Sequence, residues 1–130
     1  MSSIEANILL VKAERKLKHA ERGFEEEDYD STVGDSYRCI ELCMRSLLLA
    51  HGFNMIPKTH GGLLQAFSKE IVLKGIFPKD VAKEISGIIS LRARADYAAL
   101  FVSREEAVKA LEICRKIFQI TKQVISKKLQ

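Results

Sequence analysis

Apolar residues recur every three or four positions along most of the chain, which is the period of an amphipathic helix. The segments with this pattern cover residues 3 to about 25, 28 to 50, 59 to 75, 78 to 101, and 103 onward. No stretch alternates with the two-residue period of a half-buried strand. The pattern predicts an all-α fold, an antiparallel up-and-down four-helix bundle with an additional short helix, five helices in total.

Local signals set the boundaries of these helices. Gly52 follows an apolar run as a helix C-terminal glycine does, and Pro57 blocks helix in the stretch that follows. Ser103 with Glu106 three residues later forms a capping box for the last helix. The short third helix therefore lies across the long connection between the second and the fourth.

The second helix is apolar on two sides. Leu42 and Leu49 lie nearly opposite its main stripe, beside Arg38 and Arg45. Such a helix is either central in a bundle or has its second face on a partner chain. The two arginines are seven residues apart on one side, so they can bind an anion together. The alternative is that they are surface arginines with their stems packed along the protein.

The fourth helix carries a charged pair on an apolar stripe. Arg92 and Asp96 are four residues apart, so they can touch along one helix face. Their side also holds the apolar residues Val81, Ile85, Ile88, Ile89 and Leu100. A charged pair facing a core has a desolvation cost, so it is either a buried strut between helices or a phosphate-binding group that lines a polar cleft. Arg94 points the other way, and Tyr97, at the edge of the stripe, can hydrogen-bond into either arrangement.

A histidine stands where the third helix begins. His60 precedes Gly61 and Gly62, and Thr59 or His60 itself opens the helix. It is either a cap or packing residue, or a polar group at a helix start that favours anions.

Composition narrows the class of protein. With 130 residues we expect one domain over 1–130, and the net charge of +4 permits nucleic-acid contact without demanding it. Cys39, Cys43 and Cys114 have no metal-ligand spacing and are expected to be buried thiols in a reducing cytosol. No apolar run is long enough to cross a membrane, and the N-terminus lacks a signal-peptide pattern, which favours a cytoplasmic protein.

The common catalytic motifs are missing from the sequence. There is no glycine-rich phosphate loop after a strand, no HExxH, no Cys/His cluster and no GxSxG serine. We therefore expect neither a metal ion nor another cofactor, and the pattern disfavours a metalloenzyme or an enzyme with a covalent nucleophile.

The order of several short features resembles the HEPN domain, in particular its small stand-alone prokaryotic members. These features are Ser36-Tyr37-Arg38, Pro57-Lys58-Thr59-His60-Gly61-Gly62, the Phe-Pro before the fourth helix, Arg92-x-Arg94-Ala95-Asp96-Tyr97 and Ser103-Arg104-Glu105-Glu106-Ala107. Together they span nearly the whole chain. The resemblance implies a helical bundle, often a homodimer, that is frequently paired with a minimal nucleotidyltransferase in toxin–antitoxin or defence systems.

Active members of that family are metal-independent ribonucleases with an Arg-x4-6-His motif at the dimer interface. The resemblance places the arginine of this motif at Arg92 and its histidine at Tyr97 or just beyond, yet no histidine follows His60. A tyrosine, with a pKa near 10, is a poor substitute for imidazole as an acid or base at neutral pH. The nuclease pair is therefore incomplete, and we expect no catalytic residue from this motif.

Three functional hypotheses follow. The first is a homodimeric binding module for a nucleotide or RNA, with candidate ligand residues Arg92, Asp96, Tyr97, Arg38, Arg45 and His60, which acts with a minimal nucleotidyltransferase. The second is a weak metal-independent ribonuclease in which Asp96, Tyr97 or a spatially close His60 replaces the missing histidine. The third is a purely structural partner protein, with an internal Arg92–Asp96 strut and a partner surface at Leu42 and Leu49.

Overall fold

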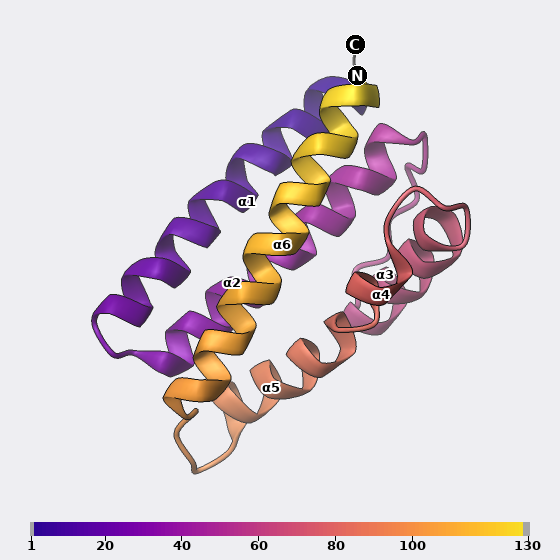
Figure 1. Ribbon diagram of the computed structural model, residues 1–130. Helices are drawn as coiled ribbons and strands as arrows, with labels where there is room; N and C mark the ends of the chain where they lie inside the picture. Colours follow the sequence, from indigo (N-terminus) through magenta and orange to yellow (C-terminus); the bar gives the residue numbers. More distant parts are fainter. Residues whose placement is uncertain (1, 129–130) are drawn as a thin grey trace.

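Long helices run up and down beside one another in the computed structural model, which describes residues 2–128 (Figure 1). They are α1 (Ser2–Glu25), α2 (Tyr29–Ala50), α5 (Ile85–Tyr97) and α6 (Arg104–Lys128). In the view of Figure 1, α1 and α5 descend, α2 and α6 ascend, and both ends of the chain lie at the top. No strand occurs in the described range, and the predicted all-α fold is confirmed.

The connection between α2 and α5 carries the short elements. They are α3 (His60–Phe67), a π-helical turn η1 (Ser68–Val72) that extends it, and α4 (Lys79–Ala82). They lie across the flank of the bundle opposite α1 (Figure 1). After η1 the chain reverses at Gly75, whose φ of +75° is the left-handed conformation that glycine adopts at low cost. The expected short helix is therefore present, with a π-helical end.

Side-chain caps fix the starts of α2 and α6. Asp28 accepts a hydrogen bond from the Ser31 amide at 3.2 Å at the start of α2. Ser103 and Glu106 exchange hydrogen bonds with each other's amides at 3.1 and 3.0 Å, which is the predicted capping box of α6. Each cap satisfies amides that have no partner within the helix, so the boundary is set locally.

The core lies where α2 packs between the other long helices. Ala6, Ala13 and Ala20 of α1 are fully buried at seven-residue intervals, and such small side chains allow close approach to α2. The thiols of Cys39, Cys43 and Cys114 are buried as predicted. Hydrogen bonds from Cys114 and Cys43, followed by burial, raise the pKa of the Cys39 thiol well above its usual range, so this thiol stays protonated.

The prediction of a continuous fourth helix that runs to about residue 101 is wrong at two places. It is interrupted at Lys83 and Glu84, where the Glu84 amide bonds to the Val81 carbonyl three residues back, just before the weak helix formers Ser86 and Gly87. It also ends at Tyr97, because the Val102 amide donates to Asp30 at 2.8 Å and the chain must turn to reach it. Leu100 and Phe101 are consequently exposed in a loop instead of on a helix stripe.

The second apolar side of α2 faces the protein itself. Leu42 is 3% exposed because α5 and α6 both pack on α2. Leu42 is therefore not available to a partner, whereas Leu49 is only partly buried, and α2 is the central helix of the bundle. Every helix in residues 2–128 is too short or too polar to cross a membrane.

Candidate functional site

A buried carboxylate organises one face of α2. Glu41 follows Arg38 by three residues and precedes Arg45 by four, so all three side chains share one side of the helix. The Glu41 side chain is only 6% exposed. Its Oε1 accepts a hydrogen bond from Arg38, and its Oε2 lies 3.8 Å from an Arg45 nitrogen. A carboxylate this deeply buried needs such cationic partners to offset its desolvation.

The loop before α3 places His60 over this carboxylate. Thr59 caps α3 by accepting the Gly62 amide at 3.0 Å. A Cβ on Gly62 would lie 2.7 Å from the Thr59 hydroxyl and 2.9 Å from Pro57, so only glycine allows the turn to close this tightly. The His60 Nδ1 atom is then 3.3 Å from Glu41 Oε2 and 2.6 Å from the Tyr37 hydroxyl.

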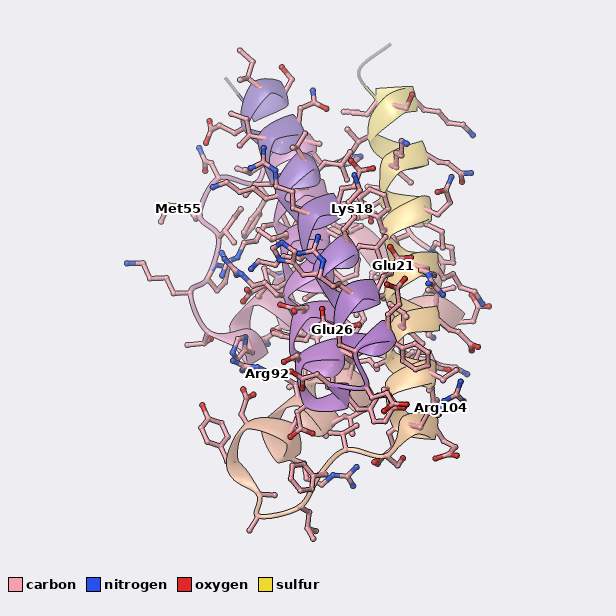
Figure 2. All side chains as sticks on the ribbon, turned by 90° about the vertical axis from the view of Figure 1, so that its left-hand side faces the viewer. Lys18, Glu21, Glu26, Met55, Arg92 and Arg104 are labelled. Carbon is pink, nitrogen blue, oxygen red and sulfur yellow. The ribbon has the colours of Figure 1, made fainter. Side chains whose placement is uncertain are left out.

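Arg92 reaches the same point from α5. Its NH1 donates to His60 Nε2 at 2.9 Å, and its Nε lies 3.1 Å from Asp96 Oδ2 in an ion pair. The guanidinium carbon also lies 5.4 Å from the centre of the Tyr37 ring, within cation–π range. Figure 2 shows the Arg92 side chain on the same flank as Met55, away from α6. Arg92 thus joins α5 to both α2 and α3.

The hydrogen bonds define the protonation of His60. A guanidinium has only donors, so the Nε2 atom that faces Arg92 must accept. The ring is then neutral with its proton on Nδ1, from which it donates toward Tyr37 and Glu41. Burial, followed by the charge of Glu41, raises the pKa of Tyr37 from 10.0 to about 12. The phenol therefore stays neutral at physiological pH.

This Glu41 cluster, which we define as Tyr37, Arg38, Glu41, Arg45, His60, Arg92 and Asp96, is buried at its base and open at its rim. The side chains of Arg38 and His60 are 49% and 41% exposed, and that of Arg92 is 28% exposed. Guanidinium groups at such a rim keep N–H donors available to solvent. They suit oxyanions such as phosphate, which they can bind through two parallel hydrogen bonds.

Most of the predicted site residues meet in this cluster. Arg92, Asp96, Arg38, Arg45 and His60 come together, whereas Tyr97 is 81% exposed and lies outside it. The Arg92–Asp96 pair lies at the rim and is not a strut sealed in the core. Whether these residues bind a ligand stays a prediction.

Two members of the cluster were missed as site residues, Tyr37 and Glu41. Their signal is the run Tyr37, Glu41, Arg45 at four-residue spacing, which places two polar groups in line with the buried side of a helix.

A hollow lies on the other side of α5. It measures about 470 Å³ between α5 and α6, and its walls include Gly87, Ser90, Arg94 and Lys109. Arg94 is already paired there with Glu106 of α6. We place the candidate site at the Glu41 cluster instead, because charged groups from α2 and α5 converge there around the imidazole of α3. Within residues 2–128, no three potential metal ligands gather into a binding set.

The amino-acid sequence has clear relatives. The family model described as "HEPN domain" matches residues 6–124. "Putative toxin MJ0142" of Methanocaldococcus jannaschii is 33% identical over 104 residues, which cover 79% of this chain and 69% of the relative. "Putative toxin MJ0605" of the same organism is 31% identical over 103 residues, covering 79% and 75%.

A third relative matches almost from end to end. "UPF0332 protein glr0978" of Gloeobacter violaceus is 26% identical over 124 residues, which cover 94% of this chain and 97% of the relative. The family match takes in all the residues of the Glu41 cluster and the four long helices that carry or support it, apart from the helix ends. The chain belongs to the HEPN domain family.

Proposed function

We propose that this protein is a toxin-like HEPN protein that binds the phosphate of RNA or of a nucleotide at the Glu41 cluster. The observation that carries this proposal is the contact at 2.9 Å between Arg92 of α5 and His60 of α3, above the buried Glu41 of α2. Two of the relatives carry the name "Putative toxin". RNA offers the phosphate groups that exposed guanidinium rims recognise.

The charge of the cluster supports an anionic ligand. Arg38, Arg45 and Arg92 supply three positive charges, and Glu41 and Asp96 supply two negative charges. The excess of one positive charge lies at a half-exposed rim, where a phosphate oxygen can replace a water molecule on the guanidinium groups. Charge-assisted hydrogen bonds of this kind contribute about 1.5–3 kcal/mol each.

Titration of ATP and of short RNAs tests the site. We expect Arg92→Ala to weaken binding at least about tenfold, the value of one charge-assisted hydrogen bond. Arg94→Ala is the matched control, because it removes the same side chain two residues away on α5, on the side that faces α6. If the wild type binds neither ligand, or if both variants bind as the wild type does, the site assignment is wrong.

We further propose that the protein acts as a cytoplasmic homodimer together with a minimal nucleotidyltransferase. The support is the family membership and the resemblance of the chain to small members that occur with such a partner. Light scattering of the purified protein measures its oligomeric state, and copurification with a nucleotidyltransferase encoded next to it tests the pairing. A monomer that retains no such protein would contradict this part of the proposal.

A second candidate is a weak metal-independent ribonuclease in which His60 supplies the missing imidazole. It is favoured by the distance of 2.9 Å between His60 Nε2 and Arg92, which brings a base and a phosphate-binding group together from different helices. Labelled RNA should then be cleaved in the presence of a chelator by the wild type, and not by Arg92→Ala or His60→Gln. Equal cleavage by all three proteins, or by none of them, removes this candidate.

A further inference from the structure

The neutral His60 ring is poorly arranged to receive an anion. Its Nε2 atom presents a lone pair on the side from which Arg92 approaches. A phosphate oxygen that binds Arg92 here would face that lone pair, and two acceptors repel each other. For the imidazole to donate to the phosphate, Nε2 must carry a proton. The free and the anion-bound clusters therefore differ in the protonation that they favour at His60.

Among residues 2–128, the charged and titratable groups recorded in contact with His60 lie on two helices. From α2 come Tyr37 and Glu41, with Arg38 and Arg45 behind Glu41. From α5 comes Arg92, with Asp96 behind it. Three guanidinium groups and two carboxylates leave one positive charge with His60 neutral, and two positive charges when His60 is protonated.

This count distinguishes two kinds of phosphate. A phosphodiester inside an RNA chain carries one negative charge, whereas a terminal phosphate carries close to two at neutral pH because its second pKa is near 6. A cluster with a protonated His60 balances the second kind.

We propose that the Glu41 cluster takes a terminal phosphate group, of a nucleotide or of an RNA end, and that His60 takes up one proton from solvent as that group binds. This inference rests on the proposed phosphate-binding function. Arg92 transfers its NH1 donor from His60 Nε2 to a phosphate oxygen, and Nε2 receives the proton and donates to the same phosphate. The Nδ1–H remains directed at Glu41 and Tyr37 throughout.

Calorimetry measures the proton directly. Adenosine 5′-monophosphate is titrated at about pH 7.5, where the free ligand is mostly the dianion, in buffers with different ionisation enthalpies. We expect uptake of about one proton per site, and none with His60→Gln, which keeps an amide donor for Glu41 but cannot be protonated. The control Arg94→Ala should take up the proton as the wild type does. Circular dichroism confirms that each variant is folded.

A matched diester tests the ligand class. Adenosine 3′,5′-cyclic monophosphate has the same base and sugar with one negative charge, and we expect it to bind at least about tenfold more weakly to the wild type. The His60→Gln variant should show a smaller difference in affinity between the monophosphate and the cyclic diester. Adenosine 3′-monophosphate and 5′-phosphorylated dinucleotides then show whether the preferred terminal phosphate is that of a 3′ or of a 5′ end.

The outcomes separate the two proposals. Binding that depends on Arg92 but involves no proton uptake, or equal affinity for the monoester and the cyclic diester, overturns this inference and leaves the phosphate-binding function intact. Absence of binding to every phosphate ligand, or binding indifferent to Arg92→Ala, overturns both. Nitrogen NMR of the His60 ring gives a second reading, because it distinguishes the free Nδ1–H form from the doubly protonated form expected in the complex.

Discussion

The two arginines of α5, Arg92 and Arg94, have similar sequence surroundings and very different partners. Arg94 pairs with one carboxylate, Glu106 of α6, at the open groove between these helices. Arg92 forms an ion pair with the Asp96 carboxylate, donates a hydrogen bond to the neutral ring of His60, and lies over the Tyr37 ring. The first arrangement is a common surface ion pair, whereas the second holds a cation beside a group whose charge can change.

The difference follows from what lies beneath each arginine. On the Arg94 side the side chains of Arg94 and Glu106 are 46% and 35% exposed, so water screens their interaction. On the Arg92 side the supporting carboxylate is Glu41, almost completely buried in α2. An organised polar cluster over a buried charge has a stability cost that surface ion pairs do not have, and functional sites are where such costs are commonly retained. This comparison is why we assign function to one side of α5.

The largest difference in unfolding free energy between the two sides of α5 is expected when one carboxylate is removed from each side. We expect Glu41→Gln to lower the free energy of unfolding by about 1–3 kcal/mol, because the buried negative charge that Arg38 and Arg45 share is lost while both guanidinium groups remain. Glu106→Gln keeps the capping box of α6 and should cost less than about 1 kcal/mol. Urea unfolding of both variants measures this. Equal losses would mean that Glu41 is no more than another surface partner.

The local parts of this architecture were predictable from the sequence. Caps such as Ser103 with Glu106 involve residues three apart, and the Arg92–Asp96 pair involves residues four apart on one helix, so spacing alone brings them together. Burial of the thiols was also predictable, because apolar periodicity identifies the face that a helix buries.

The parts that were not predictable depend on distant contacts. The end of α5 is decided by Asp30, which binds the Val102 amide from 72 positions away. The meeting of His60 with Arg92 depends on the direction of the loop before α3, which spacing does not define. Glu41 gave no clear signal because a single acidic residue on a helix is usually solvated, and its burial follows from the packing of α3 and α5 over α2.

The next largest effect on stability is expected from the phenol of Tyr37 at alkaline pH. Its pKa is about 12 in the folded protein and 10.0 in the unfolded chain, so the unfolded chain loses this proton first. The contribution of Tyr37 to stability is therefore complete below about pH 10 and is lost as the pH rises through 12. Absorbance titration should show an ionisation near pH 12 that disappears in Tyr37→Phe.

The same variant provides the control at neutral pH. Tyr37→Phe removes one hydrogen bond with His60 and should cost about 1 kcal/mol there. Its stability should then fall less steeply than that of the wild type above pH 10. An unchanged slope would show that the environment of Tyr37 does not oppose its ionisation.

Replacement of the pair on α5 separates a binding role from a structural one. Arg92→Met combined with Asp96→Leu removes both charges, and because the pair lies at the rim we expect less than about 1 kcal/mol of change in unfolding free energy. Phosphate binding should be lost in the same protein. Retained binding in a folded double variant would support a purely structural role for the pair.

The smallest effect is expected at Tyr97, the candidate residue that lies outside the cluster. Its ring is 81% exposed at the end of α5, one residue after Asp96, and the chain turns away immediately at Ala98. Tyr97→Ala should therefore change neither phosphate affinity nor proton uptake, and should alter the unfolding free energy by less than about 0.5 kcal/mol. Calorimetry with adenosine 5′-monophosphate and urea unfolding of this variant measure both quantities. A loss of affinity comparable to that of Arg92→Ala would extend the site along α5 to its exposed end, and the distinction between the two faces of that helix would no longer define where the ligand binds.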